Sequence, residues 1–289
     1  MAYRVQYKCP VCGLPLELQT RSLHCEKNHN FDQSRSGYVN LLLAQHKQSR
    51  QPGDADEMVM ARQRFLEQGY YLALAQGLEQ ILIQIMQKRS RAEGFQLLDV
   101  GCGEGYYLQQ LSQLLSKTGL SLQLAGIDIS KKAIHEHAKR RLGVQLAVAS
   151  AKDLPYFEHE FDLLLSIFSP VYLEEAARVL KDDGILMMVG PGKTHLKGLM
   201  QAIYTDVFEH RGNYAELAQS PLFQWQDTIE IIQEITVAGS DILDLLTMTP
   251  YYWHTPPEQK MHLETMSELK TPIHFQIQTY FKTKQQDLK

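Results

Sequence analysis

The sequence has no apolar run long enough to cross a membrane, few cysteines and little net charge. Its 289 residues are 44% apolar and 21% charged, with a net charge of −4 at pH 7. These fractions are those of an ordinary globular chain, and no run approaches the roughly 20 apolar residues of a transmembrane helix. The first residues also lack the apolar segment of a secretion signal. We therefore expect a cytoplasmic protein without a membrane anchor.

Only four cysteines occur, which is too few for a disulfide framework in a chain of this length. Three of them, with one histidine, form the pattern C-x2-C-x12-C-x3-H: Cys9, Cys12, Cys25 and His29. This spacing is typical of a tetrahedral Cys3His zinc site. The short polar segments around it cannot form a core of their own, so a metal would supply much of the folding free energy.

Two alternatives to zinc are a C-x-x-C redox pair and unligated surface thiols. The redox pair lacks its usual context near a βαβ unit, because it precedes any predicted helix. His24 competes as the fourth ligand, but the spacing favours His29. The sequence therefore predicts a zinc-binding module over residues 1–40.

Acidic residues outnumber basic ones in the chain as a whole, but positive charge is concentrated at its N-terminal end. Residues 1–53 contain seven Lys/Arg and three Asp/Glu, whereas acidic residues predominate in the remainder. Such an asymmetry is expected when one module binds a polyanion. Residues 41–56 are predicted to form a linker, in which Lys47 and Arg50 could contact phosphates or simply be solvated.

The most informative segment is a strand, glycine turn and helix start within residues 95–106. The buried strand Phe95–Val100 leads into D-V-G-C-G-E-G, in which Asp99 precedes Gly101, Gly103 and Gly105. Glycines let the backbone approach a ligand and adopt positive φ. A dinucleotide fingerprint needs G-x-G-x-x-G, but here the third glycine comes one residue early. The acid-first form resembles motif I of S-adenosylmethionine (SAM) methyltransferases; a glycine turn without a ligand is the alternative.

Strands and helices are predicted to alternate after this turn. Strands are expected at 95–100, 122–127, 144–149, 161–168, 185–189, 228–236 and 274–281. One helix is expected to begin at residue 56 and a second, longer one to end at about residue 86. Further helices are expected at 106–116, 131–141, 173–180 and 241–246. Alternation of this kind predicts a parallel sheet covered on both faces. The predicted fold is α/β, a Rossmann-like, seven-stranded SAM-methyltransferase sheet over residues 57–289.

Acids also follow the next two predicted strands. Asp128 comes 23 residues after Gly105, where a carboxylate can accept both hydroxyls of a ribose. A helix N-cap is the alternative role, but Ser130 already fills it. Asp153 and Leu154 resemble motif III, whose acid meets the adenine amine and whose neighbour packs on the ring; a polar turn is the alternative.

Three further segments are less specific. Phe168-Ser169-Pro170 lacks the Asn/Asp-Pro-Pro-aromatic tetrad that holds an exocyclic amine, which argues against methylation of such an amine. His195 is expected at a helix start, where it could contact a ligand with lowered proton affinity or be solvated. The aromatic segment Thr249–His254 could stack on an extruded base or be buried under a loop.

Taken together, these motifs resemble one family over essentially the whole chain, the bacterial 23S rRNA guanine-N1 methyltransferases of the RlmA type. The shared features, in order, are the zinc ligands, Phe31-Asp32, the run from Gly37 to Leu41, residues 46–54, the loop from Asp99 to Tyr107, Pro191-Gly192 with His195, and Met248-Thr249-Pro250.

The resemblance implies a zinc-binding module for RNA and a SAM-binding domain. It implies that Tyr71, Gly103, Glu104 and His195 contact the cofactor, and that the target is N1 of a guanine in a hairpin loop of 23S rRNA. Zinc would be structural, since four protein ligands leave no open position. Asp99 is expected to orient the loop and the amino-acid end of SAM. No residue stands out as the general base, and a homodimer would be unsurprising.

Two rival functions remain: a SAM methyltransferase acting on a small molecule such as a quinone or an antibiotic, and a zinc-dependent RNA-binding protein with a vestigial SAM fold. A small substrate needs no basic zinc module, which argues against the first. The intact glycine loop and Asp128 argue against the second.

Overall fold

In the computed structural model, the described part of the chain comprises residues 5–46, 53–89, 94–204, 209–210 and 215–283. The linker residues Lys47 and Arg50 lie outside these ranges. Among the described residues no helix is both long and apolar enough to span a bilayer.

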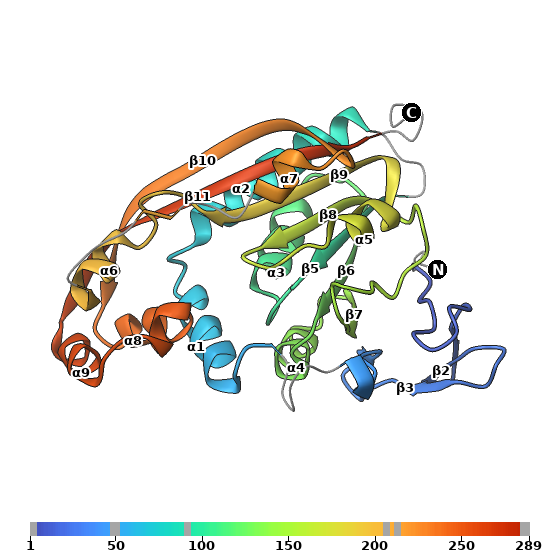
Figure 1. Ribbon diagram of the computed structural model, residues 1–289, viewed down its shortest axis with the longest axis horizontal. Helices are drawn as coiled ribbons and strands as arrows, with labels where there is room; N and C mark the ends of the chain where they lie inside the picture. Colours follow the sequence, from blue (N-terminus) through green and yellow to red (C-terminus); the bar gives the residue numbers. More distant parts are fainter. Residues whose placement is uncertain (1–4, 47–52, 90–93, 205–208, 211–214, 284–289) are drawn as a thin grey trace.

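An eight-stranded sheet in the order β10-β11-β9-β8-β5-β6-β7-β4 forms the centre of the protein (Figure 1). Its strands are β4 (Val39–Asn40), β5 (Phe95–Val100), β6 (Leu122–Asp128), β7 (Gln145–Val148), β8 (Phe161–Ile167), β9 (Leu180–Pro191), β10 (Phe223–Ala238) and β11 (Glu268–Lys282). Strands β4 to β9 pair in parallel, whereas β11 is antiparallel to both β9 and β10. The carboxyl ends of β5, β6, β7 and β8 therefore share one edge of the sheet.

The predicted seven-stranded methyltransferase sheet is present, with β4 added as an eighth strand. β4 is two residues long and pairs with β7 at Val39 and Asn40. A two-residue strand carries no periodicity that a sequence could reveal. Strands β9, β10 and β11 are longer than expected. For β10 the reason is that much of it is an exposed edge without a strong apolar pattern.

Most helices lie where the sequence predicts them. They are α1 (Asp56–Glu67), α2 (Leu72–Lys88), α3 (Tyr106–Leu115), α4 (Lys131–Lys139), α5 (Leu173–Val179) and α8 (Asp241–Thr247). Gly69, with φ 85°, separates α1 from α2. The helix expected to start at His195 is α6 (Lys197–Ile203), which begins two residues later. Helices α7 (Ala215–Gln219) and α9 (Pro257–Thr265) were not predicted; α9 has no apolar face, with Leu263 as its one buried residue.

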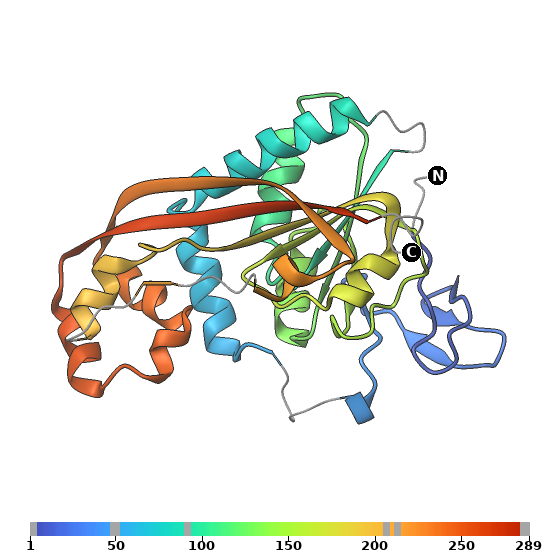
Figure 2. The same cartoon turned by 45° about the horizontal axis from the view of Figure 1, so that its top comes forward.

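Two hydrophobic clusters cover the two faces of the sheet. Alternate residues of β5 divide between them: Leu97 packs with α2 and α3, and Leu98 packs with α5 on the other face. The turned view of Figure 2 shows helices above and below the strands. All six residues of β5 are buried, which explains the continuous apolar run in the sequence.

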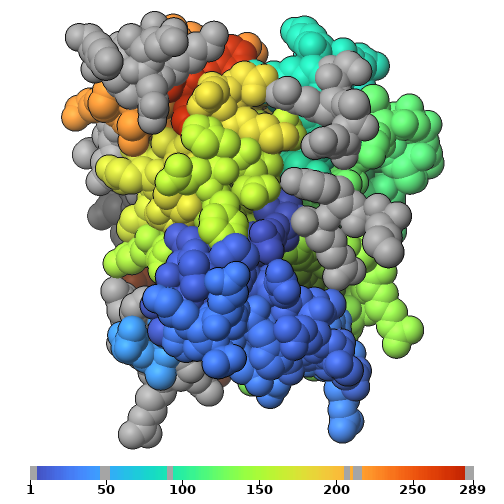
Figure 3. Space-filling model, turned by 90° about the vertical axis from the view of Figure 1, so that its right-hand side faces the viewer, coloured from blue at the N-terminus to red at the C-terminus, as the bar shows by residue number. Residues whose placement is uncertain are grey.

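The N-terminal module has a small sheet of its own, formed by β1 (Glu17–Gln19), β2 (Ser22–His24) and β3 (Asn30–Asp32). It packs directly against the rest of the chain (Figure 3). The rings of Tyr7 and Tyr156 are 5.4 Å apart, and the backbone amide of Lys8 donates to the carbonyl of Pro155 at 2.9 Å. Leu41 and Leu42, at the start of the predicted linker, are buried.

A helical group lies at the other end of the molecule from this module (Figure 1). It contains α6, α8, α9 and the 3-10 helix η2 (Pro250–Trp253). The other 3-10 turn, η1 (Ala44–His46), is not part of this group. Arg64 of α1 forms a bidentate ion pair with Asp244 of α8, at 2.5 and 2.9 Å. This pair ties the helical group to the segment that leads into α2.

Candidate functional site

The four predicted zinc ligands lie together in the N-terminal module. Their ligand atoms are all within 4.8 Å of one another. Nδ1 of His29 is 3.3 Å from Sγ of Cys25 and 3.6 Å from Sγ of Cys9, and Sγ of Cys12 is 3.7 Å from that of Cys25. Ligands at about 2.3 Å from one zinc ion are about 3.8 Å apart in a tetrahedron. The set therefore fits zinc, and His24 is not part of it.

The surroundings of Cys25 favour its thiolate, which is the form that binds a metal. Burial raises the pKa of Cys25, but hydrogen bonds from the backbone amides of His29 and Lys27 outweigh it, and the pKa is lowered to about 7. Cys102, the fourth cysteine, is buried at the glycine loop instead.

The three glycines of the loop after β5 all adopt positive φ, at 79° for Gly101, 56° for Gly103 and 90° for Gly105. A Cβ on Gly101 would lie 2.0 Å from Oγ of Ser169, and a Cβ on Gly105 would lie 2.3 Å from the ring of His137. A Cβ on Gly103 would meet nothing within 4 Å. The outer two glycines are thus required by packing, while the middle one faces open space that a ligand can occupy.

Asp99 lies near the end of β5 and is 2% exposed. Its Oδ1 has no hydrogen-bond partner among the described residues. Burial, and then the neighbouring charge of Asp128, raise the pKa of Asp99 to about 8. An unpartnered buried carboxylate is unfavourable, and a cationic ligand would stabilise it. The ammonium group of SAM is a cation of that kind.

Asp128, at the end of β6, faces the same loop. Its Oδ2 accepts from the backbone N–H of Gly103 at 2.9 Å, and its Oδ1 accepts from that of Ser130 at 2.8 Å. A carboxylate oxygen has two lone pairs, so each oxygen keeps one for a ribose hydroxyl. The N-cap of α4 is Ser130, whose Oγ accepts from the amide of Ala133 at 3.2 Å. Asp128 is therefore not needed as the cap.

Glu104 is buried in the loop but points its carboxylate at Arg140, at the end of α4. Arg140 also donates to the carbonyl of Glu104 at 2.7 Å and lies 3.1 Å from Glu67 of α1. Burial raises the pKa of Glu104 while Arg140 opposes that rise. The side chain of Glu104 is thus occupied within the protein, and Arg140, which the sequence did not single out, holds the loop between two helices.

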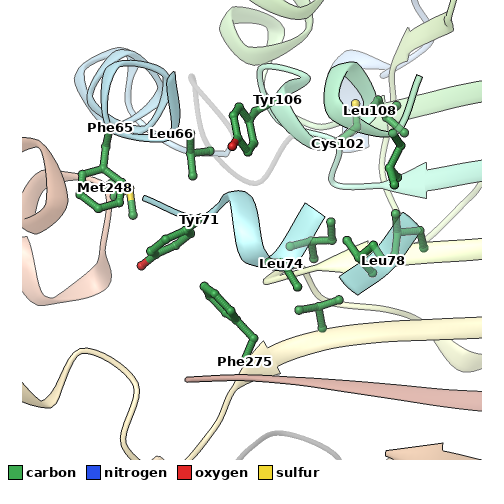
Figure 4. Packing of buried hydrophobic residues seen from close by; sticks show 14 of the residues in the cluster. Phe65, Leu66, Tyr71, Leu74, Leu78, Cys102, Tyr106, Leu108, Met248 and Phe275 are labelled. Atoms are coloured by element: carbon green, nitrogen blue, oxygen red, sulfur yellow. The ribbon is translucent and has the colours of Figure 1, made fainter. Parts of the chain in front are cut away.

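Tyr71 and His195 are brought together from distant parts of the chain. Oη of Tyr71 lies 3.4 Å from Nε2 of His195, and Tyr71 packs edge-on against Phe65 and Phe275 (Figure 4). The backbone amide of His274 donates to Nδ1 of His195 at 3.2 Å. With Nδ1 accepting, Nε2 carries the proton of a neutral imidazole.

His195 precedes its helix rather than beginning it, since α6 starts at Lys197. Burial lowers the pKa of His195 to about 3, and the neighbouring imidazoles of His210 and His274 add to this effect. The neutral imidazole expected from the sequence therefore results from burial and not from the helix N-terminus. His210, which the sequence did not single out, donates from Nε2 to the carbonyl of His195 at 3.1 Å.

The aromatic segment 249–254 includes the 3-10 helix η2. Oη of Tyr251 lies 2.9 Å from Nε2 of His210, whereas Trp253 is 62% exposed. Nζ of Lys260 lies over the ring of Tyr252, 3.8 Å from its centroid. Part of the segment thus packs against His210, which contacts His195, and part is open to solvent.

Asp153 and Leu154 follow β7, as the motif requires, but their side chains meet the zinc module. Oδ1 of Asp153 is 3.7 Å from Nζ of Lys8. Leu154 is 1% exposed and packs in the cluster that contains Tyr7 and Tyr156. Their contact with an adenine stays a prediction.

The strand order, the open glycine loop and the two facing carboxylates define a class I SAM-dependent methyltransferase with an attached Cys3His zinc module. Comparison with known proteins agrees with this class. A family model described as "RlmA, N-terminal", a zinc ribbon, matches residues 7–50, and one described as "Methyltransferase domain" matches residues 91–238.

Three curated relatives match most of the chain. YxjB of Bacillus subtilis (strain 168), named for 23S rRNA (guanine-N(1)-)-methyltransferase activity, is 32% identical over 94% of this chain and 95% of its own. The 23S rRNA (guanine(748)-N(1))-methyltransferase of Streptomyces fradiae is 29% identical over 87% of both chains. A protein of Micromonospora griseorubida named for the same type of activity is 29% identical over 86% of this chain and 88% of its own.

The chain belongs to the RlmA-type 23S rRNA (guanine-N1)-methyltransferase family. SAM is its methyl donor and zinc its structural metal.

Proposed function

We propose that this protein transfers the methyl group of SAM to N1 of a guanine in a hairpin loop of 23S rRNA. The proposal includes a cytoplasmic location and a homodimer as the assembled form. Its domains are a zinc module over residues 1–40, a linker over 41–56 and a methyltransferase domain over 57–289.

The observation that carries the proposal is the attachment of the zinc module beside the cofactor loops. Lys8 of the module reaches both Asp153 and Pro155, which follow β7. Exposed Arg21, Lys27 and Arg35 lie on the same module. Cations on a module that packs against the rest of the chain can bind RNA phosphates and present a loop to the neighbouring site.

The residues proposed for the cofactor divide by the part of SAM they meet. Asp99 would hold the ammonium group, Asp128 the ribose hydroxyls, and Asp153 with Leu154 the adenine. Gly101, Gly103 and Gly105 would form the backbone cradle. Tyr71, Glu104 and His195 are further cofactor contacts implied by the family, Glu104 through its backbone because its carboxylate is occupied by Arg140.

When bound, SAM supplies an electrophilic methyl group and the driving force for its transfer. The residues of this chain therefore have to position the acceptor in line with that methyl and exclude water. The burial of His195 keeps its imidazole neutral at physiological pH, so it adds no positive charge beside a sulfonium. We assign no general base for the N1 proton.

The decisive experiment uses 23S rRNA from a strain lacking the gene, incubated with purified protein and SAM. Methylation of guanine N1 blocks Watson–Crick pairing, so reverse transcription should stop at one guanine in a hairpin loop, and only when SAM is present. Absence of a stop, despite SAM binding by calorimetry, would contradict the proposal and favour a small-molecule substrate. Light scattering of the purified chain tests the homodimer.

A further inference from the structure

The loop after β8 displays an aromatic side chain in a strained backbone conformation. Phe168 has φ 52° and is 46% exposed. A bulky residue with positive φ is a real outlier, and such residues cluster at ligand-binding sites, where the surrounding structure enforces them. The side chain also keeps nearly half of its surface exposed, where a ligand can reach it.

Phe168 lies beside the cofactor loop. The next residue, Ser169, packs against Gly101 so closely that a Cβ there would lie 2.0 Å from its Oγ. β8 neighbours β5 on one side, whereas β6, which carries Asp128, neighbours β5 on the other. The ribose acid and the phenyl ring therefore flank the loop from opposite sides.

The ring is supported from behind and open in front. Its centroid lies 5.7 Å from that of His195 and 6.0 Å from that of Phe275. Both neighbours are buried, so they hold the phenyl ring in place without covering it.

A second exposed aromatic ring lies four residues further along the same loop. Tyr172 is 38% exposed, and Nζ of Lys152, which follows β7, is 5.4 Å from the centroid of its ring. An aromatic face beside a cation is the combination that binds one nucleotide of a single strand, by base stacking and by phosphate attraction.

We propose that Phe168 stacks on the target guanine, and that Tyr172 with Lys152 binds an adjacent nucleotide. The inference rests on the proposed function, because it requires an RNA base as the methyl acceptor. It assigns the base-binding role to side chains of the methyltransferase domain itself, separate from the basic zinc module.

The test measures methyl transfer from tritiated SAM to a 23S rRNA transcript, together with the Kd of SAM by calorimetry. Phe168→Ala and Phe168→Leu should both lower kcat/KM for RNA by about 10- to 100-fold, the range expected for loss of base stacking. Phe168→Trp should stay within a few-fold of wild type. The Kd of SAM should not change in any of them. Tyr172→Ala should give a smaller loss, roughly fivefold.

Leucine is the matched substitution, because it keeps an apolar side chain at the same φ and lacks only the aromatic face. Trp225→Ala on β10 removes another exposed ring, 59% exposed, and should leave kcat/KM unchanged. Wild-type kcat/KM in Phe168→Leu, or a weakening of SAM binding that equals the loss of activity, would overturn this inference and leave the proposed function standing. Absence of rRNA methylation by the wild type would overturn the proposed function and this inference together.

Discussion

The zinc module and the methyltransferase sheet reach stability by different routes. Each strand of the module's own sheet has three residues, and β1 and β3 have none that is buried. β5 and β8 of the large sheet are instead buried along their whole length. Burial of apolar area stabilises the second region, whereas the first buries too little and depends on its metal.

The two regions nevertheless share one core. Tyr7, Leu16 and Leu23 of the module pack in the same cluster as Leu98 and Tyr156. The other cluster, with α2 and α3, is the one that supports the glycine loop through Tyr106 and Leu108. Loss of the module should therefore abolish RNA binding, and should reach the cofactor site only at Asp153 and Leu154, which pack against the module.

The largest expected effect comes from removing zinc. Structural zinc contributes on the order of 10 kcal/mol to small zinc modules, so a strong chelator, or Cys12→Ser, should unfold the module and abolish rRNA methylation. SAM binding, followed by calorimetry, should weaken only by the contribution of Asp153 and Leu154, which pack against the module. Cys102→Ser is the control, since Cys102 lies outside the ligand cluster, and it should retain one zinc per chain by elemental analysis. A parallel loss of SAM binding would show that the regions are not separable.

Arg140→Met should cause the largest loss of stability within the methyltransferase domain. It leaves Glu104, which is 2% exposed, without its ion-pair partner, and breaking a buried pair costs about 3–5 kcal/mol. Unfolding in denaturant measures this loss of free energy of unfolding. The double variant Glu104→Gln with Arg140→Met should recover part of the loss, because no buried charge is then unpaired. Equal stabilities of the single and double variants would contradict this account.

Asp128→Ala should weaken SAM binding by roughly 100-fold, about 3 kcal/mol, because charge-assisted hydrogen bonds to the ribose are lost. Calorimetry checks this, and zinc content should stay at one per chain. An unchanged Kd for SAM would rule out ribose recognition by this residue.

Asp99 should make SAM binding depend on pH. Its pKa is about 8 without ligand, and a bound cation lowers that value, so binding below pH 8 must release a proton. The Kd of SAM should then fall by up to about tenfold per pH unit as pH rises from 6 to 8, and level off above 8. Asp99→Asn should remove this slope. A wild-type Kd independent of pH would show that Asp99 does not pair with the ammonium group.

Removal of the ion pair between Lys8 and Asp153, which joins the two regions, should change the free energy of unfolding least. Their side chains are 23% and 48% exposed, and surface ion pairs contribute about 0.2–1 kcal/mol. A double-mutant cycle with Lys8→Ala and Asp153→Ala should give a coupling free energy in that range, reduced at high salt. A larger coupling would mean that the module is held mainly by this pair and not by Tyr7 and Tyr156.

The parts of the fold that the sequence predicts are those with a strong local signal. The strand Phe95–Val100 has the predicted ends, and the expected helices agree to within a few residues. β4 was missed because two residues carry no pattern, and α9 because it has no apolar face.

Sequence alone determined the four zinc ligands and the order of acid and glycines in the cofactor loop. Metal coordination and tight turns depend on residue types at short, fixed spacings, and those can be read along the chain. Tertiary structure alone decided that Arg140 holds Glu104, that Leu154 packs with Tyr7, and that His195 is neutral because it is buried. These pairings join residues far apart in the chain, and burial depends on the packing of many elements at once, so no local pattern encodes them.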